Sequence, residues 1–231
     1  MLLQLVYLVV FIVVLSTLRT RLVYELSGTS LLMFGSTRPG ILLYSIFVLP
    51  GTIIHELSHW IVAEILQVRT GEITILPELK GDGDRERLGS VATERTDPLR
   101  GFLIGVAPFI TGTAILLVLG SLLSAGLSTY PLWQILLMLY GVMVIGNSMM
   151  ISREDRRTWP FIITLLIVVG FIIYRYFPTV ISNNTDAISR MLLPLNQVLG
   201  VTAGFNLVMI GGSYGLRRLI EKITKRRLVH K

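Results

Sequence analysis

Long apolar runs separated by short polar stretches are the main pattern of the chain. Six runs stand out, at residues 2–18, 41–67, 101–123, 132–151, 160–177 and 191–215. Most of them approach or exceed the roughly 20 residues that a helix needs to cross a bilayer. The pattern predicts an all-α polytopic membrane protein with about six transmembrane helices, forming a single membrane domain over residues 1–231.

The composition agrees with a membrane protein and excludes several soluble classes. Hydrophobic residues make up 52% of the chain and charged residues 15%, with a mean hydropathy of +0.71. Charged residues in globular proteins run at roughly 25%. The absence of cysteine excludes disulfides, iron–sulfur clusters and thiol catalysis. A net charge of +7 would suggest a nucleic-acid ligand in a soluble protein. Here the basic residues lie between apolar runs, so we expect no nucleic-acid partner.

The distribution of Lys and Arg predicts which loops face the cytoplasm. With six crossings, most of the 21 basic residues fall on the face that holds both termini and the loops 68–100 and 152–159. The positive-inside rule therefore places both termini in the cytoplasm. We expect a multi-pass protein of a cell membrane, and a compact chain of this kind fits a prokaryotic membrane.

Two segments outside the apolar runs carry further structure. In the loop 68–100, residues 72–76 and 88–93 are predicted to be strands around a turn at 81–84. This predicts a small β-hairpin with a free edge. The tail 216–231 is basic and amphipathic. It is either an interfacial helix against anionic lipid or a solvated flank that stops translocation.

The second apolar run contains the sequence His55-Glu56-Leu57-Ser58-His59, which is an HExxH motif. On a helix the two histidines lie on one face, one turn apart, so both can ligate one metal ion. Glu56 can then activate a water molecule as a general base. A buried charge is costly here, about 2.5–3.5 kcal/mol for an acidic residue at the centre of a membrane helix, and therefore marks a functional site. The alternative is a polar cluster that holds helices together, or a proton relay.

Two histidines do not complete a catalytic zinc site, which usually has three protein ligands. Cysteine is absent and the remaining histidine lies in the tail, so the third ligand should be a carboxylate or an amide. The candidates near membrane depth are Glu64, Asn147, Asp155, Asp186 and Asn206. Glu64 points away from the histidine pair on a helix, and Asp186 falls on the opposite face of the membrane. Asp155 closes the fourth run on the side where the second run ends.

These features resemble the site-2-protease-type intramembrane zinc metalloproteases. Members of that family carry HExxH in one membrane helix, and a later helix supplies an Asn and, eight residues on, an Asp. Asn147 and Asp155 have this spacing. The hairpin after the motif and the stretch Leu103-Ile104-Gly105-Val106-Ala107-Pro108 also look like the family. The resemblance covers residues 41–157, which would form the catalytic core.

The resemblance implies a zinc-dependent endopeptidase that cuts membrane-anchored proteins near the cytoplasmic side. Its site would consist of Glu56 as the catalytic base, His55, His59 and Asp155 as the ligands of one zinc ion per chain, and Asn147 as a substrate or oxyanion contact. The chain departs from the family between Asn147 and Asp155, where it has no proline, and Arg-Arg follows in place of Gly. From the residues alone, Asp155 could instead cap the fifth helix, and Asn147 could make an interhelical hydrogen bond.

Two functions of other classes stay open. One is metal or proton transport through the His/Glu cluster, and the other is a protease-like protein that binds a substrate without cutting it. A transporter should place further ionisable groups along a path through the bilayer. The sequence shows no clear membrane-embedded charge outside residues 55–64. Just before the motif, Pro50-Gly51 predicts a kink that makes room at the site.

Overall fold

The computed structural model describes residues 2–74, 90–94, 96–149 and 159–225. Within these ranges the chain is mostly helical. Its elements are α1 (Leu2–Phe34), α2 (Arg38–Ile65), β1 (Thr70–Thr74), β2 (Ser90–Thr93), α3 (Pro98–Gly126), α4 (Leu132–Ser148), α5 (Trp159–Tyr176) and α6 (Pro178–Thr224).

Four of the described helices are long and apolar enough to cross a membrane. They are α1, α2, α3 and the 184–224 part of α6. The 17 residues of α4 and the 167–176 part of α5 are apolar but shorter. The helical, membrane-spanning character predicted from the sequence is therefore confirmed, whereas the count of six crossings is not.

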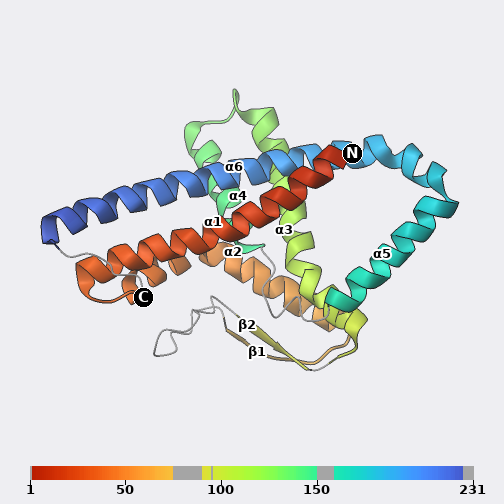
Figure 1. The fold of residues 1–231 in the computed structure, drawn as a ribbon, viewed down its shortest axis with the longest axis horizontal. Helices are drawn as coiled ribbons and strands as arrows, with labels where there is room; N and C mark the ends of the chain where they lie inside the picture. Colours follow the sequence, from red (N-terminus) through yellow and green to blue (C-terminus); the bar gives the residue numbers. More distant parts are fainter. Residues whose placement is uncertain (1, 75–89, 95, 150–158, 226–231) are drawn as a thin grey trace.

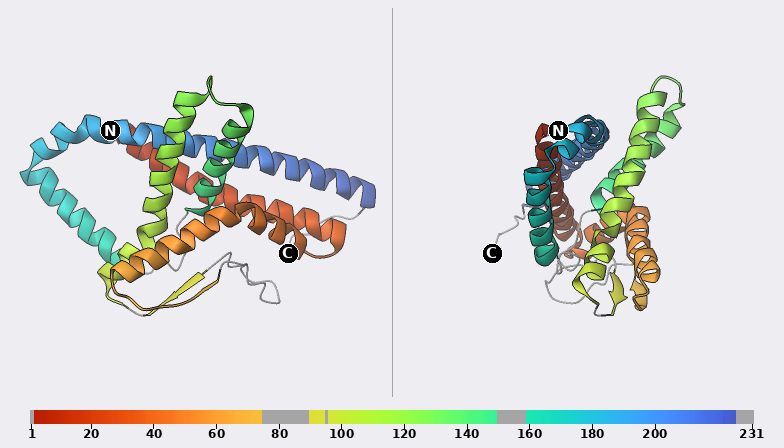
Figure 2. Two further views of the ribbon diagram at one scale, coloured as in Figure 1. Left: turned by 180° about the vertical axis from the view of Figure 1, so that it is seen from behind. Right: turned by 90° about the vertical axis from the view of Figure 1, so that its right-hand side faces the viewer.

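The helices α1 and α6 lie side by side along most of α1 and run in the same direction (Figures 1 and 2). Asn196 Nδ2 donates to Gln4 Oε1 at 2.7 Å near one end of the pair. Near the other end, Arg217 Nε lies 2.9 Å from Glu25 Oε2. In six alternating crossings the first and last helices would run in opposite directions. The observed pair differs from that arrangement.

The helices α3 and α4 run across the α1/α6 pair, and α4 returns toward α2 (Figures 1 and 2). The last turns of α4 lie in the main hydrophobic core. Met149 is 1% exposed, and an added Cβ at Gly112 of α3 would collide with the Met149 side chain. The other buried members of this core are Leu15, Leu116, Val142, Ile145, Leu195, Val198, Leu199 and Ala203. Side chains of α1, α3 and α6 therefore fix the end of α4.

Local sequence signals explain where α1 ends and where α2 and α3 begin. Gly35, with φ of +70°, follows the end of α1 in a conformation that favours glycine. Ser30 Oγ accepts the backbone N–H of Gly40 at 3.0 Å, which ties the start of α2 to α1. Asp97 caps α3 by accepting the N–H groups of Leu99 and Arg100 at 3.1 and 3.0 Å. These bonds, led by the one from Arg100, hold the pKa of Asp97 below its usual value.

The two strands pair in antiparallel fashion, with Ile73 opposite Val91 and Thr74 opposite Ser90. The pairing is short and irregular between Thr70 and Ile73. The strands contact α2. They overlap the segments predicted at 72–76 and 88–93. The turn predicted at 81–84 lies outside the described residues, so a complete hairpin stays a prediction.

The basic tail continues the last helix. Helix α6 extends without interruption to Thr224, so residues 216–224 belong to it. Arg217 is 8% exposed and faces Glu25 of α1, whereas Leu216 and Leu219 are exposed. Residues 226–231 lie outside the described part of the chain. The exposed apolar side chains fit an interfacial surface, and Arg217 has a packing role that the sequence did not indicate.

Candidate metal centre

The HExxH motif lies in the second half of α2, as predicted. The ring centroids of His55 and His59 are 4.9 Å apart, with an angle of 82° between the ring planes. His59 and Glu56 are each only 6% exposed, and His55 is partly buried. The helix therefore presents two imidazoles one turn apart, with a buried carboxylate between them in sequence.

His59 is oriented by the backbone of α3. Its Nδ1 lies 2.8 Å from the carbonyl oxygen of Ile104, and both residues are buried. A carbonyl oxygen can only accept, so Nδ1 carries the proton in this contact. In the neutral ring the lone pair then belongs to Nε2, the nitrogen that would ligate a metal. Histidine ligands of metals characteristically donate their other N–H to a carbonyl or carboxylate in this way.

The α2/α4 contact brings the end of α4 close to the motif. The hydroxyl of Tyr140 donates to the carbonyl oxygen of Phe47 at 2.8 Å. One turn further along both helices, a Cβ added at Gly51 would lie 2.7 Å from Val144 Cγ1 and would also collide with Ser148 Oγ. Gly51 therefore permits close approach, as expected of a small residue in a membrane-helix interface. Helix α4 ends beside α2 one turn before His55.

The third ligand predicted from the sequence, Asp155, lies outside the described residues. Among the residues that the structure does describe, no three His, Asp or Glu side chains gather into a metal-binding group. The whole ligand set, His55, His59 and Asp155, therefore stays a prediction.

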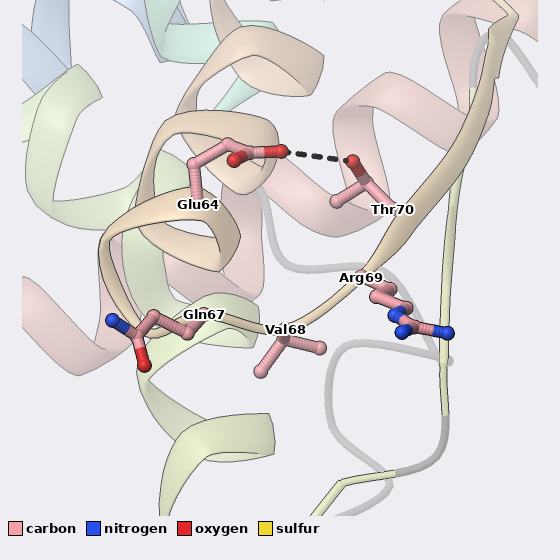
Figure 3. Close-up of a pocket in the computed structure, with 5 residues that line it drawn as sticks. All are labelled: Glu64, Gln67, Val68, Arg69 and Thr70. Atoms are coloured by element: carbon pink, nitrogen blue, oxygen red, sulfur yellow. Dashed lines mark hydrogen bonds between the residues drawn. The ribbon is translucent and has the colours of Figure 1, made fainter.

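Glu64, another candidate ligand, lies in a shallow, open pocket of about 440 Å³ between the end of α2 and β1. Its Oε1 accepts the hydroxyl of Thr70 at 3.4 Å, and Figure 3 shows the two side chains facing each other. Gln67 and Arg69 point away from this contact (Figure 3). Asp186 is exposed on α6. Neither carboxylate joins the histidine pair.

Asn147 and Asn206 pair with each other. Asn147 Nδ2 donates to Asn206 Oδ1 at 3.1 Å and to the Met143 carbonyl at 2.9 Å, and Asn206 Nδ2 donates back to Asn147 Oδ1 at 2.8 Å. Both amide hydrogens of Asn147 are thus engaged in this structure. The geometry matches the interhelical hydrogen bond that the sequence left open, and an oxyanion contact would require this pair to open.

Residue types and spacing did not indicate two polar contacts of the structure. The first is the bond to the Ile104 carbonyl, which is a backbone group. The second concerns Glu25: the expectation of no clear membrane-embedded charge outside residues 55–64 was wrong, because Glu25 is fully buried in the membrane-spanning helix α1. Glu25 forms ion pairs with Arg21 and Arg217, each at 2.9 Å. The four-residue spacing of Arg21 and Glu25 is a sequence signal for the first of these pairs.

Comparisons with known proteins add no relative. No family model, no curated protein and no solved structure matches the chain. The functional argument therefore depends on the residues and on their geometry.

Proposed function

We propose that the protein is a zinc-dependent intramembrane endopeptidase that hydrolyses membrane-anchored proteins near the cytoplasmic side. The observation that carries the proposal is the His59–Ile104 contact at 2.8 Å within an HExxH helix. It gives the motif the outer contact typical of a metal-ligating histidine.

The donor set fits zinc. His55 and His59 supply two imidazole nitrogens from one helix face, and Asp155 is proposed as the third ligand. Zinc bound there would polarise the peptide carbonyl and lower the pKa of a water molecule. Glu56, buried next to His55 in sequence, would take the proton of the attacking water and deliver it to the departing amide nitrogen.

The position of the end of α4 supports Asp155 as the proposed third zinc ligand. Because Ser148 lies beside Gly51, the chain that continues to Asp155 leaves α4 one turn from His55. Six residues lie between Ser148 and Asp155, which is ample to reach the histidine pair. Asn147 is proposed as a substrate contact only in a state in which its pair with Asn206 opens.

Substrate binding is proposed at β1. The described residues form a two-stranded sheet, so β1 has a partner on one side only. A substrate helix must unwind before its carbonyls can be attacked, because helical hydrogen bonds occupy them. An unwound segment could add to the open edge of β1 as a further strand. The basic loop 68–100, which contains β1, is proposed to lie in the cytoplasm.

The alternative of metal or proton transport gains one observation from the structure. Glu25 is a fully buried carboxylate in a membrane-spanning helix. However, Arg21 and Arg217 compensate its charge. A buried carboxylate that is paired with arginines on the same and on a neighbouring helix fits a packing role better than a transport path. The protease therefore remains the better-supported proposal. A protease-like protein that binds without cutting stays the second alternative.

Metal content of the detergent-purified protein tests the proposal. We expect about one zinc per chain in the wild type and loss of zinc in His59→Ala and in Asp155→Ala. His230→Ala is the matched control, because it removes the one histidine outside the motif. Zinc retained in Asp155→Ala but lost in His59→Ala would reassign the third ligand. No stoichiometric zinc in the wild type after reconstitution would contradict the proposal.

Peptide-bond hydrolysis is the second readout. Glu56→Gln keeps the size and hydrogen-bonding capacity of the side chain but cannot accept the proton. We expect this variant to keep its zinc and to lose cleavage of a membrane-anchored substrate by at least about a hundredfold. Undiminished cleavage by this variant would remove Glu56 from the mechanism.

A further inference from the structure

The carbonyl that accepts the His59 hydrogen bond lacks a donor within its own helix because of a proline. Helix α3 contains Pro108 in its interior, four residues after Ile104. In an α-helix the carbonyl of residue i accepts the N–H of residue i+4. Proline has no N–H, so the helix cannot satisfy the Ile104 carbonyl in this way.

Burial makes the missing bond consequential. Ile104 is 6% exposed and packs with Ala63 and Val68 at the end of α2. A buried carbonyl without a partner is destabilising, so a donor is favoured at this position. His59 Nδ1 lies 2.8 Å from this oxygen. The hydrogen bond from His59 thus satisfies the carbonyl that α3 leaves without a helical donor, and the same bond orients the histidine ring.

We infer that Pro108 is a positioning residue for His59. Pro108 keeps the Ile104 carbonyl available, the carbonyl holds the proton of His59 on Nδ1, and the lone pair of the ring therefore lies on Nε2. The effect on the tautomer of His59 is independent of metal. The effect on zinc affinity rests on the proposed function.

The chain offers a matched control. Helices α2 and α6 also contain one interior proline each, Pro50 and Pro194. The carbonyl that Pro194 leaves without a helical donor belongs to Arg190, which is exposed. Restoring an N–H at position 194 changes a membrane helix in the same chemical way as at position 108, without a histidine at the freed carbonyl.

The first experiment reads the tautomer of His59 by nitrogen NMR on the metal-free protein with labelled histidine. The nitrogen chemical shifts and their couplings to hydrogen identify which ring nitrogen carries the proton. We expect the Nδ1–H form in the wild type and in Pro194→Ala. In Pro108→Ala the new amide competes for the Ile104 carbonyl, and we expect a shift toward the Nε2–H form. His59→Gln assigns the signal.

Hydrogen exchange at the new amide separates positioning from a change in fold. If the amide at position 108 of Pro108→Ala binds the Ile104 carbonyl, it becomes protected from exchange as the His59 tautomer changes. Pro108→Gly restores the same N–H with a weaker helix preference, so agreement of the two variants excludes an effect of helix stability alone. An unchanged Nδ1–H tautomer in folded Pro108→Ala and Pro108→Gly would overturn the inference.

Zinc affinity, measured by competition with a chelator, is the second readout. We expect a loss of about ten- to a hundredfold in Pro108→Ala, the range found for outer contacts of metal-binding histidines, and no change in Pro194→Ala. A wild type that binds no zinc would contradict the proposed function, while the tautomer would still decide the role of Pro108. A changed tautomer with unchanged zinc affinity would overturn the link from Pro108 to the metal.

Discussion

Asn147 and Asn206 exchange two hydrogen bonds between α4 and α6, at 3.1 and 2.8 Å, while being 1% and 0% exposed. Next to this amide pair, a Cβ added at Gly146 would lie 2.6 Å from the hydroxyl of Thr202. The small residue brings the two helices close enough for the amides to meet. The contact fixes the last turn of α4, from which the chain continues toward Asp155.

Removing one member of the amide pair should destabilise the protein. Asn206→Leu leaves the buried amide of Asn147 without its partner, and we expect a loss of about 1–3 kcal/mol in the free energy of unfolding. Asn147→Leu should cost a similar amount, and the double variant less than the sum of the two. Reversible unfolding in mixed micelles measures all three variants. Strictly additive losses would show that the pair is not coupled.

The same variants separate a structural from a substrate role of Asn147. If Asn147 only joins helices, Asn147→Leu and Asn206→Leu should reduce cleavage to a similar degree. If Asn147 also contacts the substrate, Asn147→Leu should lose about tenfold or more beyond the loss in Asn206→Leu, at equal zinc content. Steady-state cleavage rates of the two variants distinguish these outcomes.

The ion pair between α1 and α6 predicts a sharp contrast between two neighbouring arginines. Arg217→Met removes a partner of the fully buried Glu25, and we expect a cost of about 3–5 kcal/mol because a buried charge loses compensation. Arg218→Met is the control, since the Arg218 side chain is 64% exposed and its carboxylate partner Glu221 lies 3.8 Å away. Thermal unfolding of both variants should show a large shift for Arg217 alone. Equal shifts would contradict the assignment.

The apolar pattern predicted that helices form, but it predicted less well where they begin and end and which helices pack together. The apolar run 2–18 became a helix that continues to Phe34, and the run 191–215 became part of a helix from Pro178 to Thr224. In both cases the helix extends through polar residues, which a search for continuous apolar runs leaves out. Glu25 and Arg217 compensate each other there, and such compensation depends on a partner far away in sequence.

In the candidate site, too, the sequence predicted local features but not contacts between helices that are far apart in the chain. The placement of His55, Glu56 and His59 on α2 follows from local spacing, and the sequence predicted it. The contact from His59 to the Ile104 carbonyl depends on how α3 packs against α2. The pairing of Asn147 with Asn206 depends on α6 in the same way, so the sequence could only leave it as one of two interpretations.

A proline in β1 should test substrate addition at the strand edge. Ile73→Pro removes an N–H from β1, fixes φ at that position and weakens strand pairing. We expect impaired cleavage with one zinc per chain retained, because the histidine pair lies on α2. Glu72→Ala in the same strand keeps the backbone N–H and should leave cleavage nearly unchanged. Normal cleavage by the proline variant would exclude strand addition at β1.

The parallel direction of α1 and α6 can be tested by cross-linking in a chain that has no native cysteine. Gln4 contacts Asn196, and Glu25 contacts Arg217 further along both helices. The 21 residues from Gln4 to Glu25 span about 31 Å of helix, close to the thickness of a bilayer core of about 30 Å. Two helices joined at both levels cross the membrane in the same direction, which requires an odd number of crossings between them.

We therefore expect the double variant Gln4→Cys/Asn196→Cys to cross-link efficiently with an oxidant or a short thiol-reactive linker in native membranes. The control Gln4→Cys/Tyr214→Cys places the second thiol 18 residues further along α6, about 27 Å away, and should not react. Electrophoretic mobility with and without reductant reports both variants. Cross-linking of the control pair instead would show antiparallel helices, as six alternating crossings with both termini in the cytoplasm require. The parallel result would place the beginning of α1 and the end of α6 on opposite sides of the membrane, so that the two termini could not both be cytoplasmic.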